Sequence, residues 1–225
     1  MTFAPLDMWQ ELYPPGTWPE GPLAGQDVYA ATLPDGRQIL LPIRVLPGGA
    51  GRAVASLILN QASFAVLDAL CDAVVAALEA VPAVVVGLPT LGLPLAEGLA
   101  RRLGHARMVP LSTSRKFWYD DALSEPISSI TSPGQMKRLY LDPRMLPLLA
   151  DRPVLLVDDV ISTGTSIAAA LRLLSRARVM PGAIAAAMMQ GEVWRDRLAE
   201  TAPSLPVTSA IRTPILGRGP AGWLV

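Results

Sequence analysis

Cysteine and histidine are almost absent from this chain of 225 residues, which contains one of each. The single Cys71 excludes an internal disulfide and is typical of a reducing compartment, so we expect a cytoplasmic protein. Its apolar neighbours at helical spacing, Leu70 and Val74, favour a place in the core over a catalytic role. The single His105 cannot form a histidine-based metal site. It follows Gly104 at an expected helix end, which it could cap.

Net charge is absent as well, because 19 Lys and Arg residues balance 19 Asp and Glu residues. Electrostatics therefore gives no reason to expect nucleic acid or an anionic membrane as a partner. No apolar run reaches the roughly 18 residues of a membrane span, and the first residues lack the basic and apolar regions of a signal peptide. We expect one soluble unit, long enough to bury about 70% of the surface of its unfolded chain.

Hydrophobic periodicity predicts alternating strands and helices after an irregular start. Residues 1–25 are rich in Pro, Gly and Trp, and Pro34-Asp35-Gly36 predicts the turn of a hairpin. Gly48 to Gly51 predict a flexible link. We expect strands over 27–33, 37–45, 84–86, 108–111, 136–141, 154–157 and 183–189, and helices over 63–80, 95–103, 165–177 and 192–200. This alternation predicts a parallel sheet with right-handed crossovers.

The most informative segment is residues 154–166, Val-Leu-Leu-Val-Asp-Asp-Val-Ile-Ser-Thr-Gly-Thr-Ser. Two acids, Asp158 and Asp159, follow an apolar strand, and a hydroxyl-rich loop then leads into a helical pattern. Backbone N–H groups of such a loop attract a phosphate, and the acids can bind sugar hydroxyls and a divalent metal. The alternative is an ordinary turn capped by Ser162 or Thr163, which needs neither adjacent acids nor five loop residues of this kind.

This segment resembles the phosphoribosyl-diphosphate signature of the type I phosphoribosyltransferases, in which two acids and two apolar residues precede a small-Thr-Gly-x-Thr/Ser loop. The resemblance covers roughly residues 55–190, and the helix from Asn60 to Leu78 is similar to the opening helix of adenine and orotate members. It implies an α/β fold, with a parallel sheet flanked by helices over residues 59–225. Residues 1–58 would form an N-terminal arm and a small hood containing a β-hairpin.

The resemblance also implies a reaction, the displacement of pyrophosphate from phosphoribosyl diphosphate by a nucleobase in nucleotide salvage. Mg²⁺ is the implied cofactor, since it prefers few protein carboxylates plus substrate oxygens. Asp158 and Asp159 would be catalytic, holding ribose hydroxyls and the metal. The 5′-phosphate would be bound by Ser162, Thr163, Gly164, Thr165 and Ser166. We expect a homodimer, without nucleic acid or membrane as partner.

A second loop, residues 87–94, also follows a buried strand and precedes a helix. In the resembled family this position binds pyrophosphate through backbone amides, which would assign Pro89, Thr90, Leu91 and Gly92. Adenine-specific members usually carry an arginine where this chain has Leu91, so the amides would act alone or another residue would supply the charge. Without the resemblance, a plain strand-to-helix turn explains this loop equally well.

The segment 112–135 is polar and irregular, and long enough to be a functional lid. Both lysines of the chain lie in it or at its edge, as Arg115-Lys116 and Lys137-Arg138. We expect Arg115 and Lys116 to bind pyrophosphate. A solvated surface loop is the alternative, although the three aromatic residues over 117–119 are unusual for one.

The acceptor base is the least determined feature. An acid usually precedes the Thr-Gly of 6-oxopurine enzymes, where this chain has Ser162, and residues 112–135 lack the histidine typical of orotate enzymes. Glu125, the only glutamate in that segment, could act near the leaving proton as in adenine-specific members. We therefore favour an adenine-like acceptor. The alternative is a non-catalytic protein of the same fold that binds nucleotides or phosphoribosyl diphosphate as a regulator, which Leu91 permits.

Overall fold

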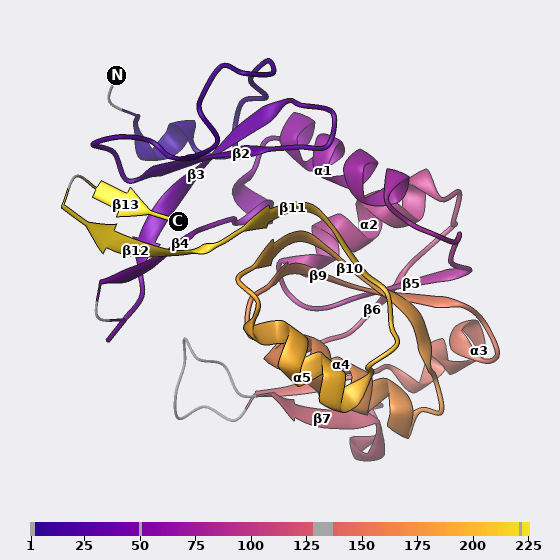
Figure 1. Cartoon of the computed structure of the whole chain (residues 1–225). Coiled ribbons are helices and arrows are strands. Elements are labelled where there is room, and N and C mark those ends of the chain that lie inside the picture. Colours follow the sequence, from indigo (N-terminus) through magenta and orange to yellow (C-terminus); the bar gives the residue numbers. More distant parts are fainter. Residues whose placement is uncertain (1–2, 50, 128–136, 221) are drawn as a thin grey trace.

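A five-stranded parallel sheet forms the centre of the computed structural model, which describes residues 3–49, 51–127, 137–220 and 222–225 (Figure 1). The strand order is β11-β10-β9-β5-β6, and every neighbouring pair is parallel. The strands are β5 (Val84–Gly87), β6 (Val109–Pro110), β9 (Val154–Ile161), β10 (Pro181–Gln190) and β11 (Val207–Thr213). The predicted α/β class with a parallel sheet flanked by helices is confirmed.

Helices cover both faces of this sheet. One apolar cluster joins α1 (Phe64–Ala76) and α2 (Gly92–Arg102) to the strand residues that point to their side, and a second joins α4 (Thr165–Arg176) and α5 (Val193–Thr201) to the opposite side. The remaining helices are short: α3 (Leu146–Leu149) and 3₁₀ turns at Pro5–Asp7, Leu59–Gln61, Asp121–Leu123 and Pro143–Met145. None of the helices within the described ranges has both the length and the apolar character of a membrane span.

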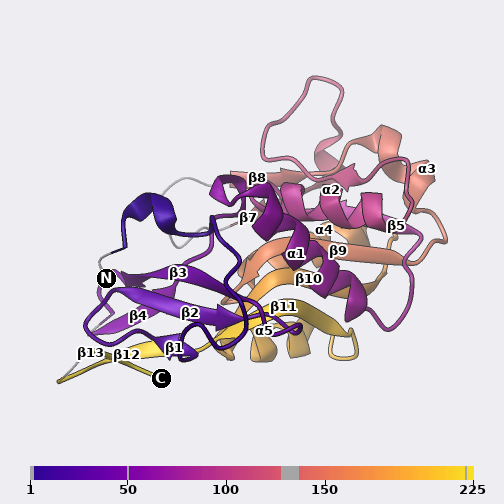
Figure 2. The ribbon, with the colours of Figure 1, turned by 90° about the horizontal axis from the view of Figure 1, so that it is seen from above.

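A second sheet of six antiparallel strands lies at one end of the central sheet (Figures 1 and 2). Its order is β1-β2-β3-β4-β12-β13, with β1 (Gly21–Pro22), β2 (Val28–Thr32), β3 (Gln38–Val45), β4 (Arg52–Ala55), β12 (Ile215–Gly219) and β13 (Gly222–Leu224). The predicted hairpin is β2–β3. Gly48, Gly49 and Gly51, which we expected to form a link, lie instead in the turn between the paired strands β3 and β4. The sheet therefore takes strands from both ends of the chain.

Most predicted elements are present with shifted ends. Ser63 caps α1, because its Oγ accepts a hydrogen bond of 3.2 Å from the Val66 amide. Gly104, at φ +74°, follows the last turn of α2. His105 does not cap that helix with its ring, which contacts the Pro82 carbonyl through Nε2 at 3.0 Å.

The expectation that residues 112–135 are irregular was wrong for β7 (Ser124–Ile127), which pairs with β8 (Lys137–Tyr140). Residues 128–135 of this segment lie outside the described residues, as does residue 136 of the strand predicted over 136–141. β7 escaped the pattern because its buried residues, Ser124 and Glu125, are polar. No strand was predicted over β11, β12 or β13 either.

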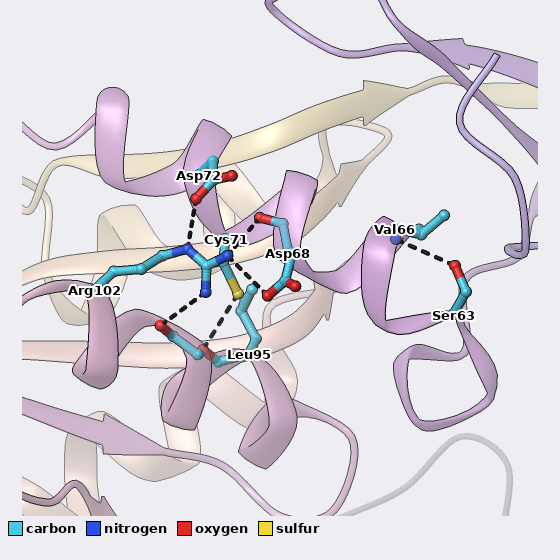
Figure 3. Close-up of polar contacts among 8 residues, drawn as sticks. Ser63, Val66, Asp68, Cys71, Asp72, Leu95 and Arg102 are labelled. Atoms are coloured by element: carbon cyan, nitrogen blue, oxygen red, sulfur yellow. Dashed lines mark hydrogen bonds and ion pairs between the residues drawn. The ribbon is translucent and has the colours of Figure 1, made fainter.

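Helices α1 and α2 contact each other closely around Cys71 (Figure 3). A Cβ built on Gly98 would lie 2.5 Å from the Cys71 sulfur, so only glycine permits this approach. Arg102 of α2 then binds Asp68 at 2.8 Å and Asp72 at 2.5 Å on α1. Burial raises the pKa of the Cys71 thiol to about 12, which leaves it an inert core residue, as expected.

Candidate active site

The acidic pair lies in the second half of β9, because this strand continues to Ile161 instead of ending at Val157 as predicted. The extra residues pair with β10, where Val160 lies opposite Met188. Asp158 and Asp159 thus sit on a rigid strand at the carboxyl edge of the sheet, which is where open α/β sheets bind their ligands.

No cation within the described residues compensates these two acids. Asp158 is only 7% exposed, and its Oδ1 accepts a hydrogen bond of 2.9 Å from the Asp159 amide. Burial, and then the charge of Asp159, raise the pKa of the Asp158 carboxyl well above its ordinary value. Burial also raises the pKa of Asp159. The described residues contain no group of three or more His, Cys, Asp or Glu that could hold a metal ion.

The loop after β5 lies directly against Asp158. A Cβ built on Gly92 would be 2.9 Å from the Asp158 Cα and 3.1 Å from its Oδ1, so any larger residue would displace the acid. Thr90 is exposed, Pro89 and Leu91 are half-buried, and the peptide bond between Pro89 and Thr90 is cis. The structure therefore brings the loop of Pro89, Thr90, Leu91 and Gly92 to the acidic pair.

The hydroxyl-rich loop connects β9 to α4. Gly164 occupies the N-cap of α4 at φ +73°, a left-handed conformation that glycine adopts without strain, and no side chain caps the helix. The cap by Ser162 or Thr163 that an ordinary turn would use is thus not formed. Instead, the hydroxyls of Thr163 and Thr165 lie 3.0 Å apart in a mutual hydrogen bond.

The amides of this loop are also free within the described residues. None of the backbone N–H groups from Gly164 to Ile167 has a protein acceptor there. The half-buried side chains of Ser162, Thr163, Thr165 and Ser166 surround them. Free amides at a helix N-terminus form a binding site for an anion.

Of three further predicted site residues, two are engaged elsewhere and one is exposed. Glu125 is 4% exposed, and its Oε1 accepts a hydrogen bond of 2.7 Å from Arg172, while Oε2 lies 3.0 Å from Arg176. Its partners are thus on the second half of α4, away from the hydroxyl loop. Arg115 is exposed and binds Asp121 at 2.8 Å, and Lys116 is exposed beside it.

Sequence reasoning missed the support behind the hydroxyl loop. α5 was predicted, but its position was not: Trp194 contacts Gly164, and Arg197 donates to the Thr163 carbonyl. A cavity of about 320 Å³ adjoins α5 at the carboxyl ends of β10 and β11, lined by Met189, Gly191, Glu192, Trp194, Arg212, Thr213, Pro214 and Ile215. No local pattern marks these residues.

Residues 55–203 match the family model of the phosphoribosyl transferase domain. The chain belongs to this family. The match includes both strand-to-helix loops and confirms the resemblance to type I enzymes, and with it the enzyme class of this phosphoribosyltransferase. No curated protein sequence is significantly similar to the chain.

Solved structures similar to this phosphoribosyltransferase include adenine phosphoribosyltransferases. The Giardia lamblia enzyme, in complex with 9-deazaadenine, is 24% identical at a TM-score of 0.55, over 66% of this chain and 80% of that one. The Rhodothermus marinus enzyme is 21% identical at a TM-score of 0.56, and the match covers 76% of this chain and 93% of that one. The Saccharomyces cerevisiae enzyme was crystallised with adenine and an imino-altritol bisphosphate. It is 19% identical at a TM-score of 0.53, and the match covers 82% of this chain and 94% of that one. At these identities the similarity shows the fold.

Proposed function

We propose that this phosphoribosyltransferase transfers the phosphoribosyl group of phosphoribosyl diphosphate to a nucleobase in nucleotide salvage, with an adenine-like acceptor favoured. The observation that carries the proposal is the contact of Gly92 with Asp158 at the end of the strand that leads into the hydroxyl loop. Three groups that suit a diphosphate, a ribose and a 5′-phosphate therefore lie side by side.

In the reaction, a base nitrogen attacks C1 of the ribose and the bond from C1 to the pyrophosphate oxygen breaks, with inversion at C1. The attacking nitrogen gives up its proton to the leaving pyrophosphate or to solvent. The protein positions both partners and stabilises the developing charge. The amides from Gly164 to Ile167, with the hydroxyls of residues 162–166, hold the 5′-phosphate. Asp158 and Asp159 accept hydrogen bonds from the ribose hydroxyls, and the backbone N–H groups of residues 90–92, which follow Pro89, face the leaving pyrophosphate.

The acidic pair fits a divalent cation. Asp158 is buried and Asp159 is half-buried; both carboxylates have raised pKa values and no basic partner in the described part of the chain, so both gain stability when a cation approaches. Mg²⁺ suits them because it binds through one or two carboxylates and otherwise through water and substrate oxygens. When bound, it would neutralise charge on the diphosphate. Asp158 and Asp159 would hold it, directly or through water.

The adenine-like acceptor is supported by the ligands of the structural neighbours from Giardia lamblia and Saccharomyces cerevisiae, 9-deazaadenine and adenine. Ser162 in place of an acid also disfavours 6-oxopurines. The proton-transfer role predicted for Glu125 has no support from its surroundings, since both its oxygens face arginines of α4. The roles of Arg115 and Lys116 toward pyrophosphate, a cytoplasmic location and a homodimer stay predictions.

To test this, the protein is incubated with phosphoribosyl diphosphate, Mg²⁺ and one base at a time from a panel of adenine, hypoxanthine, guanine and orotate. The release of pyrophosphate is then measured. We expect release with adenine and formation of the matching nucleotide. Binding of phosphoribosyl diphosphate without release with any base would favour the regulatory alternative. Absence of binding would contradict the site itself.

A further inference from the structure

We infer that α5 positions the phosphate loop, and that Arg197 is the residue through which it does so. This inference rests on the proposed function, since it concerns how residues 162–166 bind a 5′-phosphate. Arg197 lies outside the loop, on α5, and follows Thr163 by 34 residues in the chain. Arg197 is a positioning residue: it orients the peptide group between Thr163 and Gly164 and does not touch the phosphate itself.

The contact that carries the inference is a hydrogen bond of 3.0 Å from Nε of Arg197 to the carbonyl oxygen of Thr163. A trans peptide is planar, so its C=O and the following N–H point in opposite directions. With the Thr163 carbonyl held toward α5, the Gly164 N–H must point away from α5. It therefore faces the side of the loop that α5 does not cover.

That direction matters because the Gly164 amide heads the run of free N–H groups up to Ile167. Gly164 is in the left-handed region, where glycine can readily exchange with other conformations, so its flanking peptide needs an external restraint. If the peptide rotated, a carbonyl oxygen would replace the amide at the anion site and repel the phosphate. The hydrogen bond from Arg197 opposes this rotation.

Trp194 fixes the distance between α5 and the loop. Its side chain is 5% exposed, and its indole donates a hydrogen bond of 3.0 Å to the Gly191 carbonyl at the start of the helix. A Cβ built on Gly164 would lie 3.3 Å from the Trp194 carbonyl oxygen and 3.4 Å from its Cα. The loop therefore rests on the first turn of α5, and Arg197 on the next turn reaches its backbone.

The same helix offers a matched control. Arg195 is exposed like Arg197, but it pairs with Glu192 and lies over the Trp194 ring at 4.7 Å, and within the described residues it makes no hydrogen bond to the loop. Replacing either arginine by alanine removes one positive charge from α5. Only Arg197→Ala also frees the Thr163 carbonyl.

The experiment is titration calorimetry of the wild type, Arg197→Ala, Arg197→Lys and Arg195→Ala with ribose 5-phosphate and, separately, with pyrophosphate and Mg²⁺. We expect Arg197→Ala to bind ribose 5-phosphate about fivefold more weakly, which corresponds to one lost hydrogen bond. Arg197→Lys should recover part of the affinity, and Arg195→Ala should match the wild type. Pyrophosphate affinity and the melting temperature should be the same in all four proteins.

Spectroscopy separates positioning from a loss of structure. In ¹⁵N-labelled wild type, ribose 5-phosphate should shift the Gly164 amide resonance, and in Arg197→Ala this shift should shrink while the other resonances remain. Equal affinity of Arg197→Ala and wild type would overturn the inference and leave the proposed function intact. Equal weakening by Arg195→Ala would also overturn it, in favour of a general charge effect. If the wild type binds neither probe, the proposed function fails as well.

Discussion

At the scale of single residues, Asp158 and Asp159 combine a cost in stability with the proposed binding of ribose and a cation. An acid whose pKa is higher in the folded than in the unfolded protein binds more protons when folded, so the free energy of unfolding falls as pH rises through that interval. The raised pKa values of both acids thus predict a penalty that is absent near pH 4 and grows toward higher pH. Binding of a cation would relieve it.

Replacing both acids, Asp158→Asn with Asp159→Asn, should therefore stop transfer and stabilise the free protein. We expect a loss of about 3–4 kcal/mol of transition-state stabilisation, and a gain at pH 8 of about 1 kcal/mol in the free energy of unfolding. The gain should vanish toward pH 4. Denaturant unfolding across this pH range and pyrophosphate release measure the two effects. The exposed Asp151→Asn is the control; near-normal turnover of the double variant would refute the assignment.

Gly92 and Gly98 allow a matched test on one helix. Gly92→Ala should lower kcat/KM by about tenfold or more, since an added Cβ 2.9 Å from the Asp158 Cα must displace the acid proposed to bind the ribose. Gly98→Ala should instead lower the melting temperature, since its Cβ would meet the Cys71 sulfur at 2.5 Å, away from the site. Steady-state kinetics and thermal unfolding separate the two. Full activity of a folded Gly92→Ala protein would show that the loop and the acid need not touch.

At the scale of elements, the segment between β6 and β7 is the best place to look for closure. Arg115 and Lys116 are exposed, and Phe117 is 90% exposed beside them. Trypsin should cut the free protein at Arg115 or Lys116 first, because exposed loops are cleaved preferentially.

Phosphoribosyl diphosphate with Mg²⁺ should slow this cut if the basic pair binds the diphosphate. Ribose 5-phosphate is the matched control ligand, since it lacks the diphosphate and should protect little. Mass spectrometry of the fragments over time gives the rates. Equal rates with and without phosphoribosyl diphosphate would leave this segment a solvated loop and remove Arg115 and Lys116 from the pyrophosphate site.

At the scale of the whole molecule, the two ends of the chain close one sheet. β12 pairs with β4, and the indole of Trp223 donates a hydrogen bond of 2.7 Å to Asp27. This sheet joins the core through Gln190 at the end of β10, whose side-chain amide donates to the Ala55 carbonyl at 2.7 Å. This six-stranded sheet therefore joins residues 196 positions apart in the chain, Asp27 and Trp223. Its first four strands lie within residues 1–58, the predicted hood.

Trp223→Ala tests this closure. Trp223 is 9% exposed, so its truncation should lower the free energy of unfolding by about 3 kcal/mol. If the hood covers the acceptor base, the KM for the base should rise more than the KM for phosphoribosyl diphosphate. Trp223→Phe, which keeps most of the apolar contact and loses only the donor to Asp27, should have smaller effects. An unchanged melting temperature of Trp223→Ala would mean that β13 contributes little to the hood.

The sequence alone determined the features that depend on neighbours along the chain. Continuous apolar runs predict β5 and the first half of β9 because both faces of these strands are buried, and helical periodicity predicts α1 and α4. Ser63 caps α1 through an amide three residues away. The hydroxyl loop and the acids beside it are likewise contiguous, so their chemistry follows from the order of the residues. Gly164 of this loop adopts a positive φ, a conformation that favours glycine over other residues.

Only the tertiary structure decided which distant segments meet. The short strand β12 pairs with β4, which lies more than half the chain away in sequence. The arginines beside Glu125, Arg172 and Arg176, come from α4, about 50 residues later in the chain. The support of the phosphate loop by Trp194 and Arg197, and the contact of Gly92 with Asp158, arise from how helices pack against the sheet. A one-dimensional pattern encodes which face of an element is buried, but not which partner covers it.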